Sequence, residues 1–423
     1  MGASSLSRFV VLPVTALAGA LTTYVVIDYA GVSQFAYIAL AGTLFQLIPF
    51  ADLGLGAAIV NAVAGEKRDG DATTLVARTV RAAFLALAMS GAAVVVLSAA
   101  VSGLNLWGPI LGLPVALQTV ANWAVFLALV PFAISLPLGI GQRVLLGLGK
   151  NHYVNLIGGI GPVVAVLTTL LLVKLGAEPM FLAIATPVGV LVVAAACFIV
   201  ALRQPGWRPP SSSEPIAALR VEPVRLWSAA APMLIISVAV PLAMQSGRLV
   251  LSHVGTPVDL AEYSVGFQFY APSLSLAVTA AVTLWPVFAR NRAQSGSLWR
   301  RVLGLMTAAG LMLGLGFALL INPVASVVTN GAVSVSPPTA IAFGVLLFVM
   351  SAHQPSAVLL TTPRLLAFQA ACCVVMLAIA VGLAFVLGPI FGASGIVVGA
   401  IIGVALGQLV PGIWRSAKLV GAK

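Results

Sequence analysis

The sequence predicts an all-α integral membrane protein with about twelve transmembrane helices. Of its 423 residues, 61% are hydrophobic and only 7% are charged. The apolar residues form runs of about 20, the length that an α-helix needs to cross a bilayer. When these runs are taken as spans, 19 of the 21 Lys and Arg residues fall in every second connection. This is the positive-inside pattern, so both termini are predicted to face the cytoplasm, which makes this a multi-pass protein of the cytoplasmic (inner) membrane.

The apolar runs give the predicted spans in order. The second run is too long for a straight crossing and contains Pro49, so we expect a tilt or a kink there. The twelve predicted spans lie near residues 9–27, 35–64, 80–102, 119–146, 154–174, 180–202, 229–254, 263–288, 302–324, 339–361, 366–387 and 395–414.

Charged residues mark the two sides of the predicted membrane. Only two cations, Lys174 and Arg248, fall outside the predicted cytoplasmic connections and termini. The acids that fall at predicted outer ends are Asp28, Glu178, Asp259 and Glu262.

A linker divides the chain into two predicted halves. Residues 203–228 are rich in Pro, Ser and Arg, and they separate an N-terminal bundle, 1–202, from a C-terminal bundle, 229–423. Internal similarity supports a duplication, because residues 144–150 resemble 358–364 at an offset of 214 and residues 183–184 resemble 395–396 at an offset of 212. Two six-helix units in the same orientation would be related by a pseudo-twofold axis along the membrane normal. The alternative is that Ala-, Val-, Leu- and Gly-rich helices resemble one another by composition.

Several function classes are disfavoured. The net charge of +11 does not predict nucleic-acid binding, because the cations form a rim that would meet anionic membrane lipids. Cys197, Cys372 and Cys373 lie within apolar runs, so we expect neither a disulfide framework nor a metal site. There is no P-loop, nucleophile elbow or zinc signature, and no long external loop that could hold a catalytic domain. We therefore expect no enzyme activity and no cofactor.

Four motifs point to a family. They are residues 50–59 (FADLGLGAAI), residues 245–251 (QSGRLVL) followed by 262–265 (EYSV), residues 284–290 (LWPVFAR), and residues 142–150, which begin with Gln-Arg. Taken in their order along the chain, they resemble the polysaccharide flippases (Wzx-like) of the multidrug/oligosaccharidyl-lipid/polysaccharide exporter superfamily. In that family an acid commonly precedes the arginine of the second motif, whereas here the position is Gly247.

The resemblance implies a V-shaped carrier of twelve helices. Such a carrier moves a polyprenyl-pyrophosphate-linked oligosaccharide, a precursor of cell-envelope polysaccharide, from the inner to the outer leaflet. Because a glycan and a pyrophosphate cannot cross hydrocarbon unaided, the carrier would line its cavity with polar groups and a few cations. Alternating exposure of that cavity would then move the headgroup.

Residues on the predicted seventh and eighth spans are candidates for substrate binding. Arg248 is the cation that lies inside a predicted span, away from the ends of that span. The planar guanidinium of arginine is suited to binding a phosphate. The alternative is that its side chain extends to the outer headgroups. Gln245, Ser246, Gln268 and Tyr270 offer neutral groups for sugar hydroxyls, although each could equally join neighbouring helices.

Two further polar residues are candidates for ion coupling or sugar binding. Asp52 lies about 18 Å from the cytoplasmic end of its predicted span, where it could bind H⁺ or Na⁺ or take part in gating. Alternatively it caps a helix that restarts after Pro49, and the family resemblance favours such a structural or gating role. His353 falls in the middle of the tenth span, where it could relay protons, bind sugar hydroxyls or join helices.

The leading hypothesis is a flippase for lipid-linked oligosaccharides. The first rival is an ion-coupled drug or metabolite antiporter of the same superfamily, which should have a compact acidic site within the membrane. A major-facilitator carrier shares the six-plus-six layout, but residues 66–71 do not resemble the Gly/Asp/Arg-rich loop of that family. A membrane enzyme of polysaccharide assembly, or a scaffold without transport activity, is less consistent with the scattered outer acids.

Overall fold

The computed structural model describes residues 2–47, 59–60, 63, 72–204, 223–283, 295–361 and 363–421. Every regular element in these ranges is a helix, and they contain no strand. The chain forms two compact units. Unit 1 comprises residues 1–34 and 38–227, and unit 2 comprises residues 35–37 and 228–423.

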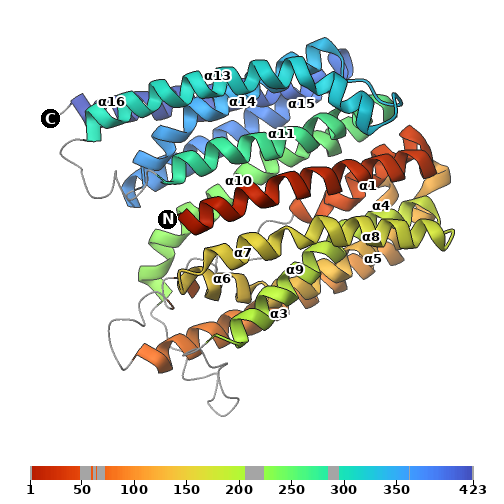
Figure 1. Ribbon diagram of the computed structural model, residues 1–423, viewed down its shortest axis with the longest axis horizontal. Helices are drawn as coiled ribbons and strands as arrows, with labels where there is room; N and C mark the ends of the chain where they lie inside the picture. The colour runs from red at the N-terminus through yellow and green to blue at the C-terminus, as the bar shows by residue number, and fades with distance from the viewer. Residues whose placement is uncertain are drawn as a thin grey trace. The chain divides into compact units, whose positions relative to one another are not determined.

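The first half of the chain begins with a 42-residue helix and continues through shorter ones (Figure 1). Its elements are α1 (Gly2–Thr43), η1 (Leu44–Leu47), α3 (Ala72–Gly103), α4 (Trp107–Ile110), α5 (Val115–Leu138), α6 (Ile140–Gly147), α7 (Asn151–Gly158), α8 (Ile160–Lys174), η3 (Pro179–Ile184) and α9 (Ala185–Leu202).

The second half begins inside the predicted linker. Helix α10 starts at Pro223, where proline suits the first helical position because the missing N–H would have no partner there. Residues 205–222 of that linker lie outside the described residues. The elements are α10 (Pro223–Val254), α11 (Pro257–Thr283), α13 (Ser295–Val328), α14 (Pro337–Leu359), α15 (Pro363–Val404), the π-helix η5 (Ala405–Leu409) and α16 (Val410–Gly421).

The described residues include nine helical segments that are long and apolar enough to cross a membrane. This result supports a multi-pass membrane protein, but nine helices do not mean nine crossings. Two of the segments contain a glycine with non-helical backbone angles, Gly31 in α1 and Gly392 in α15. Each lies between two spans that the sequence predicts separately. Twelve crossings, their orientation and the two-bundle symmetry stay predictions.

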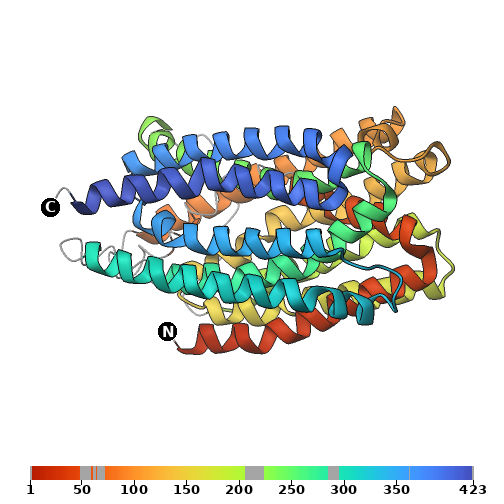
Figure 2. The ribbon, with the colours of Figure 1, turned by 90° about the horizontal axis from the view of Figure 1, so that it is seen from above.

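Helix α15 is a hairpin of two helices that turns at Gly392. This residue has φ 56° and ψ −134°, a left-handed conformation that favours glycine. The chain reverses there and returns through η5 and α16, as Figure 2 shows in blue. Residues before the turn contact residues after it in reverse order: Gly388 meets Ile396, Leu383 meets Gly399, Ala380 meets Gly403 and Met376 meets Gly407.

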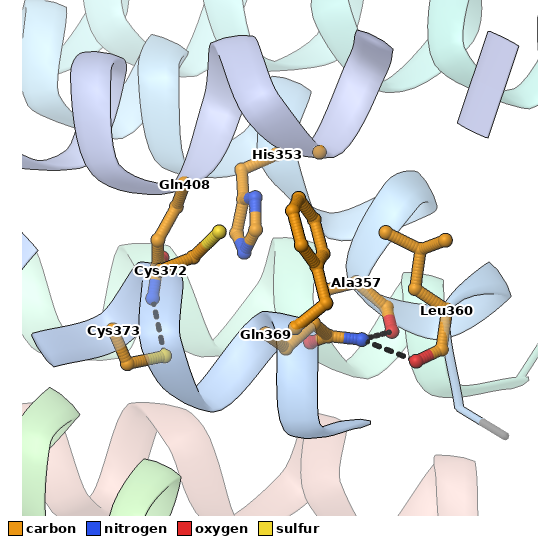
Figure 3. A pocket seen from close by; sticks show the side chains of 9 residues that line it. His353, Ala357, Leu360, Gln369, Cys372, Cys373 and Gln408 are labelled. Atoms are coloured by element: carbon orange, nitrogen blue, oxygen red, sulfur yellow. Dashed lines mark hydrogen bonds between the residues drawn. The ribbon is translucent and has the colours of Figure 1, made fainter. Parts of the chain in front are cut away.

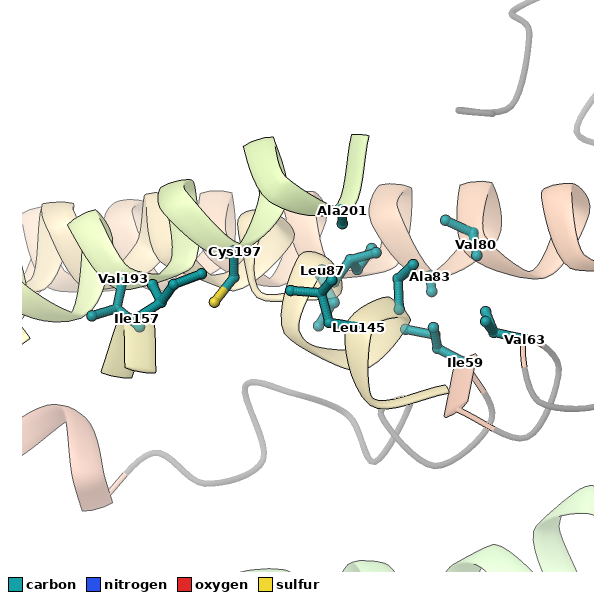
Figure 4. Close-up of a cluster of buried hydrophobic side chains, with 12 residues drawn as sticks. Ile59, Val63, Val80, Ala83, Leu87, Leu145, Ile157, Val193, Cys197 and Ala201 are labelled. Atoms are coloured by element: carbon teal, nitrogen blue, oxygen red, sulfur yellow. The ribbon is translucent and has the colours of Figure 1, made fainter. Parts of the chain in front are cut away.

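Unit 1 has an apolar core in which Leu145 and Cys197 are completely buried (Figure 4). Small and branched side chains from α3, α6 and α9 fill it, and Ile59 and Val63 join them although most of their neighbours in sequence are not described. The predicted kink at Pro49 and the candidate residue Asp52 both lie outside the described residues.

Glycine pairs let helices touch backbone to backbone in each unit. In unit 2, a Cβ on Gly344 of α14 would lie 2.5 Å from the carbonyl oxygen of Gly314 on α13. In unit 1, a Cβ on Gly189 of α9 would collide with the carbonyl of Gly161 on α8. Since lipid tails are as apolar as the side chains, close packing of this kind is a main source of helix association in membranes.

We therefore predict that Gly344→Ala destabilises the protein. The added methyl meets backbone that cannot move aside, and such overpacking costs about 1–3 kcal/mol, more than alanine gains in helix propensity. Gly316→Ala on α13 is the matched control, because its Cβ would have no atom within 4 Å. Thermal unfolding in detergent tests this prediction, and an equal shift in Tm for both variants would contradict it.

Candidate functional site

Arg248 lies within α10, six residues or about 9 Å before the end of that helix at Val254. Its side chain is only 6% exposed, so it packs inside unit 2. Its Nε donates to Ser264 Oγ and one terminal nitrogen donates to Gln245 Oε1, both at 3.3 Å. The guanidinium carbon also lies 5.0 Å from the centre of the Phe267 ring. All these partners are neutral.

The structure explains why glycine stands where the family commonly has an acid. A Cβ on Gly247 would lie 2.7 Å from the hydroxyl of Tyr263 and 2.7 Å from Cγ2 of Ile396. The Tyr263 hydroxyl instead donates to the carbonyl of Met244 at 3.3 Å, which joins α11 to α10. The ring of Tyr263 therefore fills the space that an acidic side chain would need.

An aromatic cluster extends from Arg248 into unit 2. Phe267 and Tyr270 of α11 have ring centres 5.6 Å apart, and Phe343 of α14 packs against Tyr270 at 5.5 Å. Gly266 makes this packing possible, because a Cβ there would collide with the ring of Phe343. Tyr270 is 1% exposed, and its hydroxyl has no hydrogen-bond partner among the described residues. Tyr270 is thus part of a buried core rather than an exposed lining.

The structure brings some of the predicted site residues together. Gln245 and Arg248 are bonded to each other, and Phe267 connects Arg248 with Tyr270. Ser246 and Gln268 are half-buried, and no printed bond joins either of them to Arg248. Tyr263, Ser264 and Phe267 were not among the candidate site residues, although 262–265 belongs to one of the sequence motifs. Phe267 lies one helix turn after Tyr263 and Ser264, a spacing that a search for helical periodicity would find.

Two acids fix the ends of helices in unit 2. Glu262 of α11 accepts hydrogen bonds from the backbone N–H and the hydroxyl of Ser336, at 2.8 and 2.7 Å, just before α14 begins. Asp259 accepts from the backbone and hydroxyl of Thr256 at the start of α11. These bonds satisfy N–H groups that a helix start leaves unpaired. Both acids therefore have structural partners.

His353 lies apart, in a pocket built by α14, α15, η5 and α16 (Figure 3). Its side chain is 9% exposed, Nδ1 has no hydrogen-bond partner, and the ring is hydrogen-bonded to the backbone of Gln408. The amide of Gln408 donates to Cys373 Sγ at 3.0 Å. On the far side, Gln369 donates to the carbonyls of Ala357 and Leu360 at the end of α14.

Gln408 occupies a π-helix, a form that is rare and is often found at functional sites. It widens the last span beside His353, and a Cβ added to Gly412, one turn later, would lie 3.8 Å from Nδ1 of the imidazole. No group of three or more His, Cys, Asp or Glu residues that could hold a metal occurs among the described residues.

No family model matches this chain, and no curated protein matches it. Solved structures do match it. The lipid II flippase MurJ in an inward closed conformation has a TM-score of 0.75 at 15% identity, over 97% of this chain and 87% of that one. An inward-facing multidrug resistance MATE family transporter of the MOP superfamily has a TM-score of 0.75 at 14% identity, over 96% of both chains. A Vibrio cholerae MATE transporter has a TM-score of 0.60 at 16% identity, over 100% and 98%.

At these identities the likeness shows the fold. The chain has the fold of membrane transporters and flippases of the MOP superfamily, and these structural neighbours are not enzymes. The fold that the motif resemblance implied is therefore supported. The polysaccharide-flippase family within it stays a prediction.

We predict that Gly247→Asp destabilises the protein and that Tyr263→Ala relieves part of this loss. The acid would compete with the Tyr263 ring for one space, and overpacking costs about 1–3 kcal/mol. Tyr263→Ala alone also destabilises the protein. The informative measurement is therefore the double-mutant cycle, which compares the stability loss of the double variant with the sum of the two single losses. Additive losses in thermal stability would show that the two side chains do not share this space.

Proposed function

We propose that this protein is a flippase for a polyprenyl-pyrophosphate-linked oligosaccharide. It would act in the cytoplasmic membrane by alternating exposure of its binding groups to the two sides. The fold is shared by flippases and drug transporters alike, so the choice between them depends on the chemistry of the buried polar groups.

The observation that carries the proposal is the combination of one buried cation with neutral hydrogen-bonding groups. Arg248 lies beside Gln245 and Ser264 within unit 2. The acids among the described residues lie near helix ends or turns, at Asp28, Glu178, Asp259 and Glu262. Such a set suits an anionic substrate rich in hydroxyl groups, because a phosphate needs cations and donors. A cationic drug would instead need buried carboxylates.

Arg248 is held in a way that leaves it able to change partners. Both of its described hydrogen bonds are 3.3 Å long and go to neutral oxygens. Charge-assisted bonds from arginine to an anion are shorter, about 2.7–2.9 Å, and roughly twice as strong. A phosphate that reached the guanidinium would therefore displace Ser264 and Gln245. Phe267 would still hold the guanidinium plane from one face.

Ion coupling and glycan contacts are less strongly supported. Asp52 is proposed as a coupling or gating residue, with H⁺ or Na⁺ as the candidate ions, on its sequence position alone. Gln268 and Ser246 are proposed as glycan contacts on the same basis. Tyr270 would take part only if its unpartnered hydroxyl became accessible in another conformation.

An ion-coupled drug antiporter is the second candidate function. The equal TM-scores of 0.75 for MurJ and for a multidrug resistance transporter favour neither function over the other. Efflux of a cationic dye that requires Asp52 but not Arg248 would support the antiporter.

We expect Arg248→Ala to reduce translocation of a polyprenyl-pyrophosphate sugar in proteoliposomes by about tenfold or more, because hydrogen bonds to a charged group contribute about 1.5–3 kcal/mol. Arg248→Lys should restore only part of the activity, since lysine keeps the charge but loses the planar fork.

Lys174→Ala is the matched control, because Lys174 is the other cation outside the predicted cytoplasmic rim and is exposed at the end of α8. Unchanged translocation in a folded Arg248→Ala protein would refute a phosphate contact at this residue.

A further inference from the structure

The pocket around His353 does not include Arg248 or its hydrogen-bond partners, on which the proposed function depends. Its free space is small, about 10 Å³, which is room for about one water-sized group such as a hydroxyl, and it is open on one side. Along α14 it extends from His353 to Leu360, the residue after the end of that helix. It therefore reaches the end of unit 2 at which α14 ends and α15 begins.

The inner part of this pocket has an unused hydrogen-bond acceptor. His353 Nδ1 has no partner, and the ring is bonded to the Gln408 backbone. In a neutral imidazole whose Nε2 carries the proton, Nδ1 is a hydrogen-bond acceptor. Buried polar atoms are rarely left unpaired in native proteins, so an unpaired one points to a water or ligand. A hydrogen-bond donor would pair with Nδ1 in this tautomer.

Arg364 and Arg415 lie beyond the residues that line the pocket, toward the end of unit 2 at which α14 ends and α15 begins. Residues four apart on a helix share a face, so Arg364 lies in line with Phe368 and Cys372, which line the pocket from α15. On the last helix, Arg415 follows Gln408 and Gly412 along the same face by seven and three residues. The two arginines thus mark the approach to the pocket from two helices.

These arginines lack acidic partners. In the described part of unit 2 the acids are Asp259 and Glu262, at the opposite end of the helices. Arg364 is exposed, and Arg415 is half-buried with an Nε that has no hydrogen-bond partner. Arginine side chains of this kind bind phosphate oxygens, and basic pockets between membrane helices bind lipid headgroups.

We propose that this pocket binds an anionic phospholipid with a hydroxylated headgroup, phosphatidylglycerol being the simplest example. Its phosphate lies at Arg364 and Arg415, and a headgroup hydroxyl donates to Nδ1 of His353. The site lies within unit 2 and does not depend on what the protein transports. Lipid binding can therefore fail while the flippase proposal stands, and the reverse also holds.

The test is native mass spectrometry of the full-length protein with three lipids of the same acyl chains. Phosphatidylglycerol has both the charge and the hydroxyls, phosphatidylmethanol has the charge alone, and phosphatidylcholine has no net charge. For the first lipid bound, we expect phosphatidylglycerol to bind most tightly, phosphatidylmethanol less tightly and phosphatidylcholine least tightly. Arg364→Gln and Arg415→Gln should each lower the affinity for both anionic lipids about tenfold. His353→Phe should lower the affinity for phosphatidylglycerol about threefold and leave the affinity for phosphatidylmethanol unchanged.

Arg300→Gln is the matched control, since Arg300 is an exposed cation near the start of α13 that does not line the pocket. Equal losses for Arg300→Gln and Arg415→Gln would overturn the site, because they would show that only surface charge matters. Equal affinities of the wild-type protein for phosphatidylglycerol and phosphatidylmethanol would overturn the contact with His353.

Native cysteines give a second measurement that needs no variant. Cys372 is half-buried and lines the pocket, whereas Cys197 is completely buried in the core of unit 1. Phosphatidylglycerol should slow the reaction of Cys372 with a small maleimide, and phosphatidylcholine should not. Equal rates with both lipids would contradict the proposal. Labelling of Cys197 in any variant would report unfolding rather than loss of the site.

Discussion

The constraint on which the rest of this structure depends is that hydrocarbon offers no hydrogen-bond partners. Every backbone group inside the bilayer must be paired within its own segment, so the described segments are helices. Between helices the same solvent gives little hydrophobic driving force, and association depends on close packing. The glycine contacts between Gly314 and Gly344, and between Gly161 and Gly189, are the direct result. Turns at Gly31 and Gly392 let long apolar stretches change direction with few polar residues.

In the same environment, each buried polar side chain is informative. Glu262 and Asp259 are accounted for by the helix starts that they cap. Arg248 contacts two neutral oxygens and an aromatic face. His353 has an unpaired nitrogen. The carboxylates that cap helices hold the fold. The arginine buried among neutral groups and the unpaired imidazole nitrogen are the groups that we connect with ligands.

Arg248 and His353 occupy different kinds of surroundings, and this difference separates the two proposals. Arg248 is packed against rings of α11, and its neighbours are rigid aromatic side chains. His353 lies beside a π-helix and two thiols, with empty space in front of it. A rigid environment suits a residue that must present its charge in one orientation. A small unfilled space beside an unpaired nitrogen suits a single hydroxyl group.

The sequence by itself determined the class of the protein. Charge asymmetry and apolar runs predicted a multi-pass membrane protein, and loosely spaced motifs pointed to transporters with the same fold. Periodicity also placed Arg248 and His353 inside helices, because one residue per 1.5 Å fixes depth along a helix. Only the tertiary structure decided which side chains share a space. It placed Tyr263 against Gly247, buried Tyr270 among rings, and set Arg364 and Arg415 in line with the residues that line the His353 pocket. The physical reason is that hydropathy and charge depend on each residue alone, whereas contacts depend on how helices distant in sequence rotate and pack against one another.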